Sequence, residues 1–268
     1  MMGNYNPGMY DTAMPSAPRK SMKMPLIIIG VVVAIVLVVV IMILSLGGTP
    51  VSRESALSDY KLLANYIISN KSDEVLDTSI DLTSSVEIMR RAQNYEQNLE
   101  YFKKAEEKAK TLINTARRST LNAENKAKLT DYAYAVIAYS KIQGFEYYRS
   151  TLVEKYMSDK NYDKSLNSVD EYYKDLVESG NEDLKSAGEQ LISAGRLYLS
   201  IVNELSTNNK NVREFEESLK EFYTEEQIYS YDIQINNAYT TARKKIMTQF
   251  LKQIHESWNY ANILEENN

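Results

Sequence analysis

The chain has 268 residues, a formal net charge of −5, no cysteine and one histidine. These numbers exclude a disulfide scaffold, a cysteine-ligated zinc site and a thiol nucleophile. All five prolines precede residue 51, and only four of the nine glycines follow it. Because sheets and tight βα loops use both residues in their turns, this composition predicts an all-α fold of long helices joined by short polar loops.

Residues 1–24 are rich in Asn, Gly, Pro, Met and Ser and show no apolar periodicity. A segment of this kind cannot bury enough apolar surface to offset the entropy lost on ordering it. We therefore predict a disordered tail. Its bases Arg19, Lys20 and Lys23 outnumber its single acid, Asp11.

Residues 26–44 form an uninterrupted apolar run that extends from Leu26 through Gly30 and Ala34 to Leu44. A helix of this length spans about 30 Å, which is the thickness of the hydrocarbon core of a bilayer. A buried strand would be far shorter. The run predicts a transmembrane helix over residues 25–48, with the lipid bilayer as its partner.

The bases around the apolar run predict its orientation. Arg19, Lys20 and Lys23 lie just before it, whereas only Arg53 follows it closely, with Lys61 next. Cytoplasmic flanks carry the excess of Lys and Arg, so we expect a cytoplasmic N-terminus and a single-pass signal anchor in the cell membrane. Two alternatives stay open: cleavage near residues 45–47, and the inverted orientation.

Residues 49–268 are expected to form an extracytoplasmic helical domain. Apolar residues at steps of three and four predict about seven helices with coiled-coil-like packing. We expect a boundary between two lobes near residues 158–161. Breaks between the helices are predicted near residues 70–73, 94, 119–124, 158–161, 179–181 and 207–211.

The clearest heptad pattern lies between residues 184 and 205. Seven apolar positions alternate there as a and d residues of a packing seam: Leu184, Ala187, Leu191, Ala194, Tyr198, Ile201 and Leu205. Gly188 and Gly195 lie beside the small residues of this seam. They predict the close approach of another helix.

The residues that usually carry chemistry are sparse. His255 is the only histidine, and the positions four residues away on a helix hold Leu251 and Asn259, so a metal site is not expected. There is no Gly-x-Ser-x-Gly motif and no glycine-rich phosphate loop, and we expect no cofactor and no catalytic residue. Residues 51–268 carry seven more acids than bases, which argues against nucleic acid as a partner.

Tyrosine is the unusual residue of this chain, with 21 copies against five Phe and one Trp. Neighbours on a helix point about 100° apart, so the pairs Tyr147-Tyr148 and Tyr172-Tyr173 cannot bury both rings on one face. Some rings are expected at the surface or at helix junctions. Exposed tyrosines favour contacts with proteins and glycans, although compositional drift explains the count equally well.

These observations favour a membrane-anchored helical surface protein with a non-enzymatic binding or scaffolding role at the cell envelope. Its partner would be a protein or an envelope component, and a homo-oligomer stays open. One alternative is a hydrolase of envelope polymers that uses a pair of carboxylates. Another is a ligand-sensing bundle that acts through a membrane partner.

Overall fold

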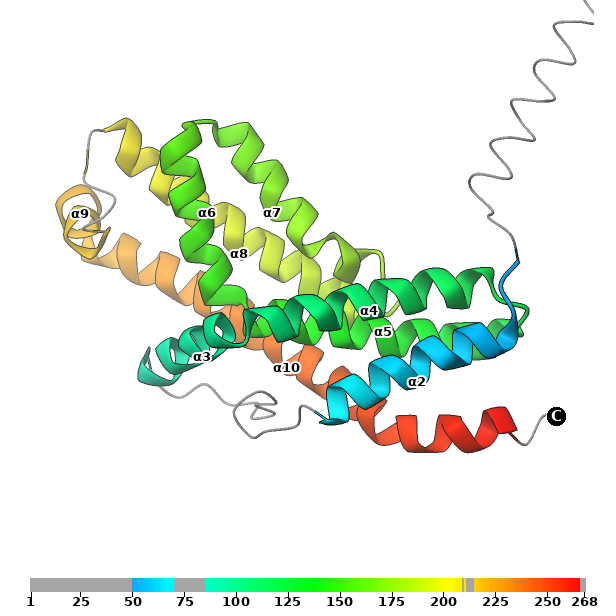
Figure 1. The fold of residues 1–268 in the computed structure, drawn as a ribbon. Helices are drawn as coiled ribbons and strands as arrows, with labels where there is room; N and C mark the ends of the chain where they lie inside the picture. The colour runs from blue at the N-terminus through cyan, green and yellow to red at the C-terminus, as the bar shows by residue number, and fades with distance from the viewer. Residues whose placement is uncertain (1–49, 70–84, 209, 211–214, 266–268) are drawn as a thin grey trace, which may run out of the picture. The chain divides into compact units, whose positions relative to one another are not determined.

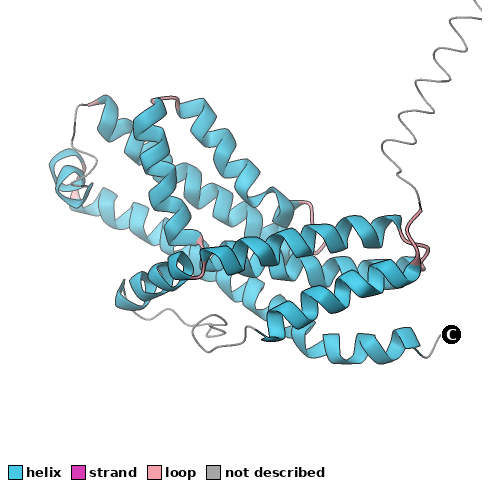
Figure 2. Ribbon diagram, in the orientation of Figure 1, coloured by secondary structure: helices cyan, strands magenta, loops and turns pink. Residues whose placement is uncertain are grey.

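The computed structural model describes residues 50–69, 85–208, 210 and 215–265. Pro50 begins a compact unit that continues to the C-terminus. Every regular element in the described ranges is an α-helix, which confirms the predicted all-α class and the helical bundle (Figure 2). The segment 26–44 and the bases Arg19, Lys20 and Lys23 lie outside the described residues.

Figure 1 shows how the helices are arranged, coloured along the chain. Within the described ranges they are α2 (Arg53–Ser69), α3 (Ser85–Gln97), α4 (Leu99–Arg118), α5 (Ala123–Gln143), α6 (Phe145–Asp159), α7 (Tyr162–Val177), α8 (Glu182–Thr207), α9 (Phe215–Phe222) and α10 (Glu225–Glu265). None of these helices combines the length and the apolar content needed to cross a bilayer.

The nine helices of the described part exceed the seven or so that the sequence predicts, because two breaks were missed. The chain bends at Gly144, where α5 ends and α6 begins, and again at Tyr223-Thr224 between α9 and α10. The break predicted near residue 94 is displaced as well, since Asn94 lies inside α3 and the helix ends at Gln97.

Asparagine side chains begin three of the long helices. The Asn122 side chain accepts a hydrogen bond from Asn125 N at the start of α5, and Asn161 accepts one from Lys164 N at the start of α7. Asn181 accepts from two backbone amides at the start of α8. These caps satisfy amide groups that have no partner within the first turn, which fixes where each helix begins.

Helix α5 is the centre of the core. Every residue from Tyr132 to Gln143 is buried. A helix that is buried on all sides needs apolar residues around its whole circumference, and the sequence AYAVIAYS within it supplies them. Lys141 is a buried charge within this stretch, and its Nζ reaches Glu106 of α4 at 2.8 Å while lying 3.9 Å above the ring of Tyr172.

Helices α7 and α8 approach closely along a stripe of small residues. A Cβ atom added to Gly188 would lie 2.9 Å from Leu176 Cβ, and one added to Gly195 would lie 2.9 Å from Val169 Cγ1. Real side chains do not approach so closely, so a side chain at either position would force a neighbour to shift, and at Gly188 the atoms opposite include a Cβ atom and backbone. The helix that packs against the two glycines is therefore α7.

The chain enters α2 through an isolated parallel bridge between Val51 and Ser119. Val51 N donates to Arg118 O at 3.0 Å, and Thr120 N donates to Val51 O at 3.2 Å. We call this contact the Val51 bridge. It ties the start of α2 to the connection between α4 and α5, so these two segments lie at the same end of the described unit (Figure 1).

The paired tyrosines lie at a helix junction. Tyr148 of α6 stacks on Tyr172 of α7 with ring centroids 3.7 Å apart, and Tyr173 meets both rings edge-on. Tyr173 is buried and the other two are partly buried. Tyr229 is the most exposed of the large apolar and aromatic side chains in the described ranges, at 68%.

Candidate binding pocket

The short helix α9 is held against its neighbours by side-chain contacts. The Tyr223 hydroxyl just after α9 donates to Glu204 of α8 at 2.5 Å, and Lys210 Nζ lies 2.8 Å from Glu221. Helix α10 then begins with a reciprocal cap between Thr224 and Gln227. These contacts turn the chain sharply and place α9 beside both α8 and α10.

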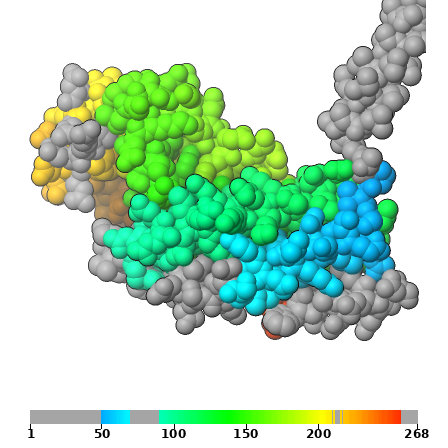
Figure 3. Space-filling model, in the orientation of Figure 1, coloured from blue at the N-terminus to red at the C-terminus, as the bar shows by residue number. Residues whose placement is uncertain are grey.

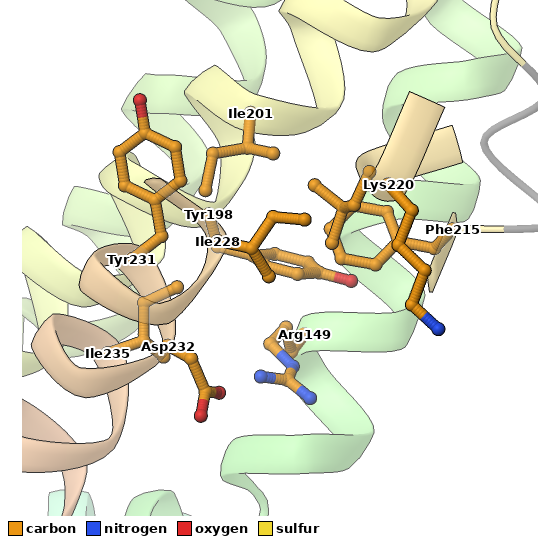
Figure 4. A pocket seen from close by; sticks show the side chains of 10 residues that line it. Arg149, Tyr198, Ile201, Phe215, Lys220, Ile228, Tyr231, Asp232 and Ile235 are labelled. Carbon is orange, nitrogen blue, oxygen red and sulfur yellow. The ribbon is translucent and has the colours of Figure 1, made fainter. Parts of the chain in front are cut away.

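The turn encloses a cavity of about 360 Å³ between α6, α8, α9 and α10. Its lining is predominantly aliphatic and aromatic, and Figure 4 shows most of the side chains. The lining residues are Arg149, Tyr198, Ile201, Phe215, Leu219, Lys220, Ile228, Tyr231, Asp232 and Ile235. Small-molecule sites occupy about 300–1,000 Å³ and have this mixture of apolar walls and few polar groups.

Arg149 is the principal fixed polar group of the pocket. Its guanidinium lies 4.8 Å above the ring of Tyr198 and 2.7 Å from the Glu146 carboxylate, one turn earlier in α6. Burial raises the pKa of Glu146, and the charge of Arg149 partly opposes that shift. This pairing orients the guanidinium beside the cavity.

Two further charges lie at the rim. Lys220 of α9 and Asp232 of α10 are exposed, and Figure 4 shows Asp232 on the same side of the pocket as Arg149. With Glu146 counted, the charges around the pocket cancel. The arrangement can bury an uncharged apolar or aromatic group, with the rim charges available to a polar end.

A second hollow gathers several acids, which is what the alternative of a catalytic carboxylate pair would need. This more open groove between α7 and α8 is lined by Asp170, Glu171 and Glu178. Asp170 is engaged by Arg196, whose Nε donates to it at 2.9 Å. Glu171 and Glu178 are exposed. The pKa of Arg196 is raised, chiefly by its hydrogen bond to Asp170, as in an ordinary surface ion pair.

The structure places six residues of the sequence-predicted seam in the core. Leu184, Ala187, Leu191, Ala194, Ile201 and Leu205 are buried, whereas Tyr198 is only partly buried because its ring lines the pocket. The buried face continues instead through Leu199 and Val202.

Other residues singled out in the sequence lie away from the pocket. His255 is exposed on α10, and the described residues contain no group of three acidic or histidine side chains able to hold a metal ion. Leu26, Gly30, Ala34 and Leu44 lie outside the described residues.

Sequence reasoning missed the pocket as a site. Phe215, Leu219 and Tyr229 have the spacing of one helical face, whereas the chain turns at Thr224 and separates Tyr229 from the other two. The spacing Thr224-x-x-Gln227 is a capping-box signal that predicts a helix start there. That signal locates the turn but not the cavity, which also needs Arg149 from α6.

The described residues form an all-helical bundle with a mostly apolar, charge-balanced cavity among α6, α8, α9 and α10. No protein-family model matches the chain, and no match was found among curated proteins or solved structures.

Proposed function

We propose that this chain is a single-pass membrane protein whose helical domain binds a partner outside the cytoplasm without transforming it chemically. The observation that carries the binding role is the pocket between α6, α8, α9 and α10. Its walls are mostly aliphatic and aromatic, and the half-buried Glu146 beside it is already paired with the lining residue Arg149. Such a lining favours the burial of an apolar group over proton transfer.

The membrane anchor rests on the sequence. The apolar run of residues 26–44 has the length of a bilayer core, and the bases at positions 19, 20 and 23 favour a cytoplasmic N-terminus. The domain from Pro50 onward would then lie outside, next to the membrane. The sensing alternative uses the same pocket, with a small apolar ligand in place of a partner's side chain.

Photo-crosslinking of the full chain in its native membranes tests the binding role. A photoreactive residue at Asp232, on the pocket rim, should yield a discrete crosslinked product. The same residue at Asn237, which is exposed on α10 but does not line the pocket, should not. Identical crosslinking from both positions would contradict a site in the pocket, and a product of small added mass would favour the sensing alternative.

The topology has its own test, because a chain without cysteine accepts single labels cleanly. An impermeant maleimide added to intact cells should label Ser158→Cys, at the exposed end of α6, but not Ser16→Cys. Labelling of Ser16→Cys alone would show the inverted orientation. Release of the protein by alkaline carbonate would show that there is no membrane span.

A further inference from the structure

Basic residues gather around the Val51 bridge, in a domain that is otherwise acidic. Two come from the end of α4, two from the first turns of α5 and one from the start of α2: Arg117, Arg118, Lys126, Lys128 and Arg53. We call these five residues the bridge cluster. The acids in the same turns are Glu54 and Glu124, so these turns have an excess of three positive charges, whereas residues 51–268 as a whole have a net charge of −7. From another part of the fold, Asp175 of α7 and Glu178 just after that helix act electrostatically on Tyr134, the residue beside Arg117.

Hydrogen bonds connect the segments that carry the bridge cluster. Val51 N bonds to Arg118 O, and Lys126 Nζ donates to Arg117 O at 3.4 Å. Lys128 bonds to Glu124 at 2.6 Å, which neutralises that acid locally. Figure 3 shows the surface of α2 beside that of α4 and α5 at this end.

Arg117 has a fixed position within the cluster. Its guanidinium donates to the Tyr134 hydroxyl at 2.6 Å and lies 5.9 Å from the centre of that ring. The side chain is nevertheless exposed. A base that is exposed and already oriented loses little conformational entropy when it meets an anion.

The position of the bridge cluster along the chain points to one partner. Only residues 45–50 separate the apolar run from Val51, and even a fully extended chain of that length spans at most about 20 Å. The headgroup layer on each side of the hydrocarbon core accounts for about 6 Å of that distance. The tether therefore limits the cluster to a narrow zone next to the membrane surface.

We propose that the bridge cluster docks the helical domain on the anionic lipid headgroups of the membrane in which the chain is anchored. This inference rests on the membrane anchor proposed above. A base near an anionic bilayer contributes about 1 kcal/mol, and the attraction decays within a Debye length of about 10 Å. Because the short tether keeps the domain close to the lipid, docking is an intramolecular event at high effective lipid concentration and does not carry the entropy cost of a bimolecular encounter.

The test uses the full chain reconstituted in bilayers, with a fluorophore on Ala123→Cys at the exposed first residue of α5. Spin-labelled headgroups should quench this probe strongly in equal parts phosphatidylcholine and phosphatidylglycerol, and weakly in phosphatidylcholine alone. A probe on Ser158→Cys, at the α6–α7 connection, should be quenched equally little in both. Raising salt from about 0.1 M to about 1 M, which shortens the Debye length from about 10 Å to about 3 Å, should remove the difference.

Substitutions then assign the effect to the cluster. Lys126→Gln should lower the docked-to-undocked ratio about five-fold, and Arg117→Gln/Lys126→Gln about 25-fold, because about 1 kcal/mol per charge corresponds to about five-fold. The matched control is Lys103→Gln/Lys155→Gln, which removes two exposed lysines; Lys103 lies 14 residues before Arg117 on α4, about 20 Å away. This control should leave the quenching unchanged.

The outcomes separate the two proposals. A chain that stays in the bilayer but is quenched equally with and without phosphatidylglycerol, or equally in the cluster variant and its control, overturns headgroup docking and leaves the anchor intact. A chain that does not remain in the bilayer overturns both. Inorganic phosphate should compete no better than chloride at equal ionic strength, and specific competition would identify a soluble anion site instead.

Discussion

Gly188 controls how closely α7 and α8 can pack. We expect Gly188→Ala to destabilise the domain, because the new methyl group would lie 2.9 Å from Leu176 Cβ and 3.3 Å from the Val177 backbone nitrogen. Overpacking of this kind lowers the free energy of unfolding by about 1–3 kcal/mol, and the higher helix propensity of alanine offsets about 1 kcal/mol of that loss. Urea denaturation followed by circular dichroism should therefore show a lower midpoint.

Gly195→Ala is the matched comparison. Its added methyl group meets only Val169 Cγ1 below 3 Å, and the next atom is 3.7 Å away. A small rotation of the Val169 side chain about χ1 relieves this contact, whereas the Cβ atom and backbone opposite Gly188 cannot rotate away. The loss should be smaller than for Gly188→Ala. Equal stability of the Gly188→Ala and parent chains would show that the two helices can separate without cost.

Helix α9 is the element whose position depends most visibly on a single side chain. Tyr223→Phe removes the hydrogen bond to Glu204 but keeps the ring that packs between Phe222 and Tyr231. Bonds to charged groups contribute about 1.5–3 kcal/mol, less where the acid is exposed, as Glu204 is. We expect amide hydrogen exchange within α9 to accelerate several-fold, with little change in the unfolding midpoint of the whole domain.

Tyr229→Phe controls for the loss of a hydroxyl, because Tyr229 is 68% exposed on α10. Exchange in α9 should match that of the parent chain in this variant. If the two variants behaved alike, the Tyr223 contact would not be what holds α9 over the pocket.

The helix boundaries could be predicted where capping chemistry marks them. Asn122, Asn161 and Asn181 lie in three of the predicted breaks, and each caps a helix through its side chain. The break at Gly144 was missed because the helical spacing of apolar residues continues across it, through Ile142, Phe145 and Tyr148. Glycine is needed there because a Cβ atom would lie 2.5 Å from Tyr95 Cζ, and a contact between α3 and the α5–α6 junction leaves no local pattern.

The pocket could not be predicted for a related reason. Arg149 and Ile235 are separated by 86 positions, and periodicity within one helix does not report which helices meet. Tyr198 illustrates this: its heptad position predicts a seam residue, yet its ring lines the cavity beneath Arg149. Tertiary packing, which the sequence pattern does not encode locally, decides between the two environments.

Buried tyrosines give the whole domain a distinctive response to alkali. Burial raises the pKa of Tyr95, Tyr101, Tyr132, Tyr148 and Tyr173 above the ordinary value near 10. Below pH 10 these groups hold their protons in both states and the stability is unaffected. Above it the unfolded chain releases protons that the folded chain retains, so stability should fall by about 1.4 kcal/mol per pH unit for each such tyrosine.

Tyrosinate absorbance and circular dichroism, measured together between neutral and strongly alkaline pH, should change cooperatively as the domain unfolds. Tyr173→Phe should move this transition to higher pH without lowering stability at neutral pH, since the Tyr173 hydroxyl has no hydrogen-bond partner among the described residues. Tyr229→Phe should leave it unchanged. Ionisation of all the tyrosines near pH 10 with the helices intact would contradict the burial of these hydroxyls.

Helix α10 contributes residues both to the pocket and to the core around α5. Ile228 lines the cavity, and Phe250, 22 residues later on the same helix, stacks on Tyr139 of α5 with ring centroids 4.0 Å apart. That separation corresponds to about 33 Å of helix, so a tilt of about 5° at the pocket would move the far end by about 3 Å. Helix α5 begins beside the Val51 bridge, so a molecule that entered the cavity and tilted α10 would also shift the helix that leads to the start of the described domain.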